Sequence, residues 1–236
     1  MYRELQAEPI LATVATLKDR IHERFPDSSL AAVAGELHDV AHRARRTAGE
    51  IARPIWPLRV AIGALIAVMV LGIAVLVPWS QAGTIFSNFP AFIQVLEAGI
   101  NDIVLIGAGI FFLATLEGRI KRRRALAAMH ELRSLAHIID MHQLTKDPDR
   151  ILRPGADTAS SPKRTLSAFD LSRYLDYCSE LLAMIGKLAA LYAEKFDDEV
   201  ALDAVNELEE LTNGLSRKIW QKMMMLHPAA GDGHHQ

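Results

Sequence analysis

A long uninterrupted apolar run occupies residues 60–77. Its eighteen positions carry no charge and nothing more polar than glycine. As a helix rising 1.5 Å per residue, this run covers about 27 Å, close to the roughly 30 Å hydrocarbon thickness of a bilayer. Arg59 precedes the run, and Pro78 and Trp79 close it with a tryptophan typical of the membrane interface. The pattern predicts a first transmembrane span over about residues 58–78.

A second apolar run is shorter and is followed by a cluster of positive charge. Residues 103–116 are uncharged, but the run is long enough to cross a bilayer only when it is extended back over Asn101 and Asp102, towards Glu97. The basic residues that follow it are Arg119, Lys121, Arg122, Arg123 and Arg124. We therefore predict a second span over about residues 97–117.

Basic residues flank the two spans on one side only. They precede the first span at Arg43, Arg45, Arg46, Arg53 and Arg59, and they follow the second at residues 119–124. The segment between the spans, predicted to be an outer loop over residues 79–96, has no charge. The positive-inside rule therefore places both termini in the cytoplasm. The first apolar run begins too far along the chain for a secretory signal peptide, and a plasma (inner) membrane location is expected.

Outside the spans, apolar residues recur three or four positions apart, which is the spacing of amphipathic helices. The pattern predicts two helices over residues 1–56, separated at residues 26–29. It predicts that the second span continues into the cytoplasm as a helix over residues 119–146. It also predicts a pair of helices with coiled-coil-like faces over residues 168–227. The expected core stripes contain Ile10, Val14, Leu17 and Ile21, extended by Phe25; Leu30, Val33, Leu37, Val40 and Ala44; Ala125, Met129, Leu132, Ala136 and Ile139; Leu171, Tyr174, Leu175, Cys178, Leu181, Leu182, Ile185, Leu188 and Tyr192; and Val205, Leu208, Leu215 and Ile219, with Leu211 beside them.

Two segments lack such a stripe. Residues 147–167 hold several prolines and small polar residues and are expected to form a linker, and residues 228–236 are expected to be a disordered tail. The whole pattern predicts an all-α membrane protein. A two-helix transmembrane hairpin over residues 57–118 carries cytoplasmic amphipathic helical hairpins at both ends.

Composition narrows the chemistry available to the chain. Its 236 residues have a net charge of −2 and include one cysteine, Cys178, which excludes an intramolecular disulfide and a zinc site built from several cysteines. Cys178 stands at an apolar heptad position and is expected to be an inert core thiol. The sequence has no glycine-rich phosphate loop, nucleophile elbow or kinase signature, so we expect no cofactor and no enzymatic activity. The arginines at 122–124 adjoin a span, and topology explains them before nucleic acid does.

Three polar residues near the start of the second span form a candidate intramembrane polar site. Glu97 and Asn101 are four residues apart and share a helix face, and Asp102 follows. An ionisable group inside a bilayer is costly and indicates a functional role. The alternative is that all three lie in water at the outer interface. Small residues in the spans, such as Gly63 and Ala67, would allow helices from several copies to approach closely.

Two further candidates lie after the second span. The basic cluster at residues 119–124 is a candidate membrane-surface patch, with anionic lipid or the acidic C-terminal helices as its partner. His130 and His137 share a helix face, and Asp140 follows three residues after the second histidine. This face is either a metal ligand set or a polar surface, and the absence of i, i+4 spacing among these residues favours the polar surface.

We therefore expect a membrane-anchored helical interaction or scaffold protein that binds a protein partner or further copies of itself and relays a signal through the second span. The alternative is a subunit of an oligomeric ion channel or transporter. Two spans cannot enclose a pore, so several copies would then place Glu97, Asn101 and Asp102 along the path.

Overall fold

The computed structural model of the chain describes residues 5–76, 89–148, 158–161 and 166–226. The regular elements among these residues are all α-helices, which confirms the predicted all-α class. They divide into two compact units, one formed by residues 1–52 and 124–236 and the other by residues 53–123. The predicted tail, most of the predicted linker and residues 79–88 of the predicted outer loop lie outside the described residues.

The first unit begins with two helices joined by a short turn. Helix α1 (Ala7–Arg24) is followed by α2 (Ser29–Ala52), and the turn falls at the predicted break. The Ser28 hydroxyl donates to the Phe25 carbonyl at 2.8 Å and accepts from the Ala31 amide at 3.1 Å. This side chain therefore satisfies one free amide at the start of α2, which is the usual role of serine at a helix N-cap.

The unit ends with a second pair, α7 (Ala168–Lys195) and α8 (Glu199–Leu226). The Ser167 hydroxyl accepts from the Asp170 amide at 3.0 Å and donates to the Asp170 carboxylate at 2.7 Å, which caps α7. The Asp198 carboxylate accepts from the Ala201 amide at 3.1 Å and caps α8. Negative charge therefore stands at the start of α8, where it suits the helix dipole.

Helix α5 (Phe89–Leu144) contributes its last part to this unit, antiparallel to α2. The first residue of α2 lies near the end of α5, since Ser29 Oγ is 3.2 Å from His142 Nδ1. The end of α2 lies near residue 124 of α5, since the Arg124 guanidinium is 3.5 Å from the Glu50 carboxylate. The two helices therefore run past each other in opposite directions.

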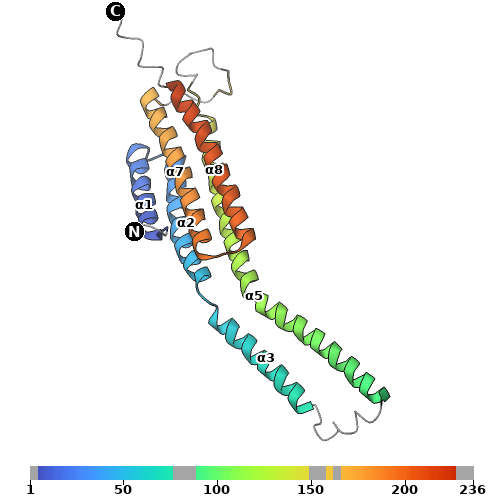
Figure 1. The fold of residues 1–236 in the computed structure, drawn as a ribbon. Coiled ribbons are helices and arrows are strands. Elements are labelled where there is room, and N and C mark those ends of the chain that lie inside the picture. The colour runs from blue at the N-terminus through green and yellow to red at the C-terminus, as the bar shows by residue number, and fades with distance from the viewer. Residues whose placement is uncertain (1–4, 77–88, 149–157, 162–165, 227–236) are drawn as a thin grey trace, which may run out of the picture. The chain divides into compact units, whose positions relative to one another are not determined.

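The remaining neighbours complete a ring of four helices. Tyr174 of α7 lies near Ser29 of α2, and Tyr192 lies near Thr47, so these two helices run parallel. Helices α7 and α8 are antiparallel neighbours joined by a short turn, and α8 returns to α5 through side-chain contacts described below. Helix α1 packs on the outside, against α2 and α7. Figure 1 shows α1, α2, α7 and α8 lying side by side.

The core of this bundle consists of the predicted apolar stripes. The residues predicted for the stripes of α1, α2, α5, α7 and α8 are buried, except that Phe25 and Leu211 are only partly so. Ile21, Leu37, Ile139, Leu181 and Leu208 are fully buried. Among the described residues, the polar side chains of Gln143 and Thr212 are also buried, and the stripes did not predict them. Burial of continuous apolar faces is the main source of stability for such a bundle.

The second unit contains α3 (Trp56–Leu76) and the part of α5 up to residue 123. Each helix has a proline in its first turn, Pro57 or Pro90, where the missing amide hydrogen costs no intrahelical bond. Because Pro90 begins a helix here, α5 starts within the segment predicted as outer loop. The helix then continues unbroken through the basic cluster, and its 56 residues belong to both units.

Burial of Cys178 generates a test of the bundle core. Burial raises the pKa of the Cys178 thiol to about 12. Compared with an exposed cysteine of pKa near 8.5, its thiolate population at pH 8 is lower by on the order of a thousandfold. We expect native protein to resist a thiol reagent that labels it at once in denaturant. The folded pKa exceeds the unfolded one, so this thiol lowers the free energy of unfolding as pH rises above about 8.5.

An Ala127→Cys variant is the matched control, because Ala127 is exposed on α5 and a thiol there is expected to react rapidly in the folded protein. Complete labelling of Cys178 in native protein at the rate of this control would contradict a closed core.

Candidate functional site

The apolar segments of α3 and α5 are the first candidate, because the described residues leave them unburied. Both helices contain a segment long and apolar enough to cross a membrane, and none of either segment is buried. Val68, Ile103 and Leu105 are each about two-thirds exposed or more, at 67%, 72% and 70%. A core helix of a soluble protein with this composition would instead be mostly buried. Apolar patches of this extent indicate contact with lipid or another protein.

A polar cluster around Glu117 links these two helices at one end. The Glu117 carboxylate accepts from Arg59 Nε at 2.7 Å and Nη2 at 3.3 Å, and Lys121 Nζ lies 2.9 Å away. The Ile55 amide, just before α3, also donates to this carboxylate at 3.4 Å. The side chains of Glu117 and Lys121 are only 13% and 12% exposed. This carboxylate is therefore held by two cations and one backbone amide.

The Glu117 cluster places the beginning of α3 beside residue 117 of α5. Charge-assisted hydrogen bonds of this kind are roughly twice as strong as neutral ones when they are shielded from water. Sequence reasoning included Arg59 and Lys121 but missed Glu117. The available signal was the pairing of Glu117 with Lys121 four residues later, which is the favourable order for a helical ion pair.

The side chains of the predicted basic patch at residues 119–124 do not all face the same surroundings. Arg119, Arg122, Arg123 and Arg124 are exposed on α5, whereas Lys121 is directed to Glu117. The Arg119 guanidinium lies over the ring of Phe112, 5.1 Å from its centroid, and Arg124 pairs with Glu50 of α2. The cluster is therefore a set of exposed arginines with one lysine turned inward.

The predicted intramembrane polar site lies in the first part of α5. Glu97 and Asn101 are exposed and share a face of the helix. The side chain of Asp102 lies outside the described residues. These positions leave Glu97 and Asn101 available to water, to lipid headgroups or to another copy of the chain.

The predicted histidine face is exposed and dispersed. His130 and His137 are both exposed on α5, and Asp140 accepts a hydrogen bond from the Gln143 side chain at 2.7 Å. The described residues contain no group of three or more histidine, cysteine or acidic side chains arranged to hold a metal ion. The structure therefore brings these three residues into no common site.

The end of α5 is held by a lysine from α8. Lys222 Nζ donates to the backbone carbonyl of Gln143 at 2.8 Å, to its side-chain oxygen at 2.7 Å and to the Lys146 carbonyl at 3.4 Å. Burial lowers the pKa of Lys222, against the opposing effect of Asp147 and Asp140. The last carbonyls of a helix have no intrahelical partner, and this ammonium group binds the Gln143 carbonyl in the last turn of α5 and the Lys146 carbonyl just after it.

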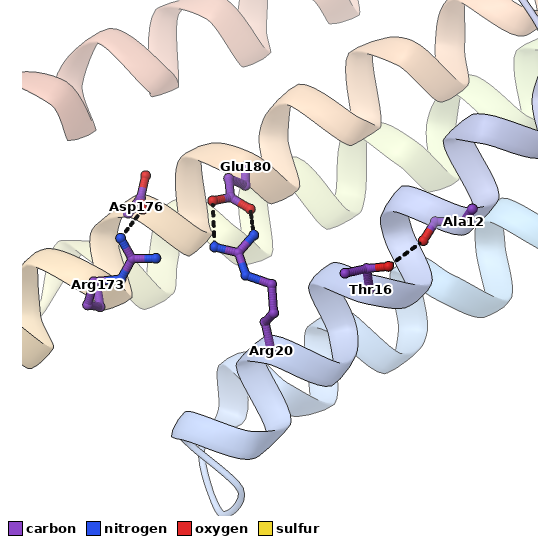
Figure 2. Close-up of polar contacts among 6 residues, drawn as sticks. All are labelled: Ala12, Thr16, Arg20, Arg173, Asp176 and Glu180. Atoms are coloured by element: carbon purple, nitrogen blue, oxygen red, sulfur yellow. Dashed lines mark hydrogen bonds and ion pairs between the residues drawn. The ribbon is translucent and has the colours of Figure 1, made fainter.

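An open cleft of about 630 Å³ lies between α1 and α7. The residues that line it are Arg20, Glu23, Arg24, Asp170, Arg173 and Tyr177. Figure 2 shows Arg20 forming two contacts with Glu180, at 2.9 and 3.4 Å, and Arg173 paired with Asp176 at 2.9 Å. Arg24 in turn lies 3.8 Å from Asp170. Because each arginine already faces a carboxylate, the cleft has no excess positive charge for an anionic ligand.

No protein-family model, curated protein or solved structure matches the chain. The exposed apolar faces and the Glu117 cluster therefore carry the functional argument on their own.

Replacing Glu117 with glutamine tests the cluster that links α3 to α5. The change keeps the size of the side chain but leaves Arg59 and Lys121 close together without a counter-charge. We expect the melting temperature of the full chain in mild detergent to fall by several degrees. Glu97→Gln is the matched control, since this carboxylate is exposed on the same helix, and it should leave the melting temperature unchanged.

The double variant with Arg59→Gln separates this ion pair from other effects. If the pair exists, the effect of Glu117→Gln should shrink once Arg59 is already glutamine. Equal shifts in both backgrounds would show that Glu117 and Arg59 act independently.

Proposed function

We propose that the chain is a membrane-anchored helical interaction protein. Residues 58–78 and 97–117 cross the plasma membrane as a hairpin, and both termini lie in the cytoplasm. The observation that carries this proposal is that no residue in the apolar segments of α3 and α5 is buried, because only lipid or another apolar surface would make such exposure favourable. The arginines at 119 and 122–124 would then lie at the cytoplasmic surface, where anionic headgroups attract them.

Self-association is the interaction that the bundle surface favours. Trp220 and Met224 are four residues apart on α8 and are 59% and 52% exposed. Tryptophan and methionine are enriched at protein–protein interfaces and are unusual on a surface that only meets water. We propose that further copies of the chain associate through this part of α8. Small residues in the spans, such as Gly63, would let the hairpins pack together as well.

Helix α5 is the element through which we propose that a signal is relayed. This helix has 56 residues without a break, and it has residues in both units. We propose that a displacement of its membrane segment passes directly to the bundle, since a helix transmits movement better than a flexible linker does.

An ion-conducting oligomer is the second candidate, favoured by the exposure of Glu97 and Asn101 on one face of α5. Several copies would arrange these side chains around a shared path, since two helices per chain enclose no pore. This candidate differs from the first in requiring conductance.

Single cysteines test the topology. We expect Ser134→Cys, at an exposed position of α5, to react with a membrane-impermeant maleimide only after cells are permeabilised. Ser80→Cys, in the predicted outer loop, should react in intact cells. The parent chain, with Cys178 buried, is the control for background labelling. Labelling of Ser134→Cys in intact cells would contradict the proposed orientation.

The oligomeric state of the full chain in lipid nanodiscs tests the interaction. We expect more than one copy per disc, and fewer copies for the double variant Trp220→Ser with Met224→Ser. Gln221→Ser, an exposed polar neighbour, is the matched control. A single copy at all protein concentrations would contradict self-association. Conductance in liposomes that is lost in Glu97→Gln with Asp102→Asn would favour the channel instead.

A further inference from the structure

Two histidines of α2 lie together on the outside of the bundle. His38 and His42 are four residues apart, so the helix projects both onto one face. His38 is partly exposed and His42 is exposed, and solvent reaches both rings. Neither residue belongs to the predicted histidine face of α5. The spacing is the one that helical zinc sites use for a pair of histidine ligands.

The geometry of this His38–His42 pair fits one metal ion. The two Nε2 atoms are 3.3 Å apart, and the rings meet edge to face with centroids 4.7 Å apart. Zinc binds imidazole nitrogen at about 2.0–2.1 Å with tetrahedral angles, which separates two such ligands by about 3.3–3.4 Å. Both nitrogens therefore stand at the separation that a shared tetrahedral ion requires, without a change of helix geometry.

A neighbouring carboxylate favours the tautomer that binding needs. His38 Nδ1 lies 3.5 Å from the Asp39 carboxylate. A carboxylate on this side holds hydrogen on Nδ1 and leaves the lone pair of Nε2 free for a ligand, as in many zinc sites. With His38 protonated on Nδ1, the hydrogen between the two Nε2 atoms belongs to neutral His42. When the ion binds, His42 would change tautomer by exchange with water, so that its one ring hydrogen lies on Nδ1 and its Nε2 lone pair is free for the ion.

The surrounding charges leave the pair accessible to a cation. Arg43, the nearest basic neighbour along α2, is occupied by the carboxylates of Glu36 at 3.1 Å and Glu131 at 2.7 Å. Its positive charge is therefore balanced, and Asp39 adds a negative charge beside the histidines. A divalent cation near the histidines therefore meets less repulsion than it would beside an arginine without carboxylate partners.

We propose that His38 and His42 bind a divalent transition-metal ion of the zinc class through their Nε2 atoms, with water completing the coordination. Imidazole is a preferred ligand of zinc, copper and nickel, whereas magnesium and calcium prefer oxygen. This site is independent of the proposed membrane function, because it lies on α2 and uses neither span.

Zinc titration of the full chain in mild detergent tests the site. The parent for this experiment carries His227→Ala, His234→Ala and His235→Ala, so that histidines near the C-terminus add no binding. Calorimetry is expected to show one zinc ion per chain. His38→Ala and His42→Ala should each abolish this binding, and Asp39→Asn should weaken it about tenfold or more, as loss of an orienting carboxylate does.

His130→Ala is the matched control, since it removes an exposed histidine from α5 and should bind zinc like the parent. Circular dichroism of each variant, unchanged from the parent, establishes that the loss of binding is local. Absence of zinc binding by the parent, or equal binding by both His38→Ala and His42→Ala, would overturn the proposal. Titration with magnesium chloride should give no heat, and equal binding of magnesium would also overturn it.

Discussion

The structure depends on one constraint, which is that an apolar helix face must be covered. In the bundle, the stripes of α1, α2, α5, α7 and α8 cover one another, and side chains such as Ile21, Leu37 and Leu208 reach zero exposure. In the apolar segments of α3 and the first part of α5, the described protein buries no residue. Helix α5 meets the constraint in both ways along its length. The proposed bilayer would cover the apolar face of its first part, and the neighbouring helices of the bundle cover the apolar face of its last part.

Charged residues lie at the end of the proposed membrane segments. Glu117 stands at the end of the apolar segment of α5, and its carboxylate is shared by Arg59 and Lys121. A carboxylate without such partners would be costly next to lipid, and two cations without it would repel each other. The cluster therefore permits charged residues of both helices to lie close together at the boundary. The exposed arginines beyond it, such as Arg122 and Arg123, have the sign that a cytoplasmic headgroup region attracts.

The sequence predicted the helices and their buried faces well, because helical periodicity is a local property. Each stripe, for example Leu171, Cys178, Ile185 and Tyr192, could be found without knowing its partner. Periodicity does not state which helices meet, so the parallel contact of α2 with α7, through Ser29 and Tyr174, was not predicted. Glu117 escaped notice for the same reason, since its main partner, Arg59, is distant in the chain. The pair His38 and His42 had a local signal, its i, i+4 spacing. The short distance between the two Nε2 atoms could be found only from the three-dimensional structure.

A relay through α5 requires that the bundle hold the end of this helix. Three side chains on two neighbouring helices hold it. Arg43 of α2 contacts Glu131 of α5, and Glu207 of α8 contacts Arg133 of α5, both at 2.7 Å. Lys222 of α8 contacts the Gln143 side chain at 2.7 Å. A shift of α5 along its axis by a few ångströms would break these contacts and expose the buried side chain of Gln143. Because a buried polar group without its partner costs about 1–3 kcal/mol, the bundle resists sliding of α5 alone. A displacement of α5 would therefore carry α2 and α8 with it, and α2 is the helix that presents His38 and His42.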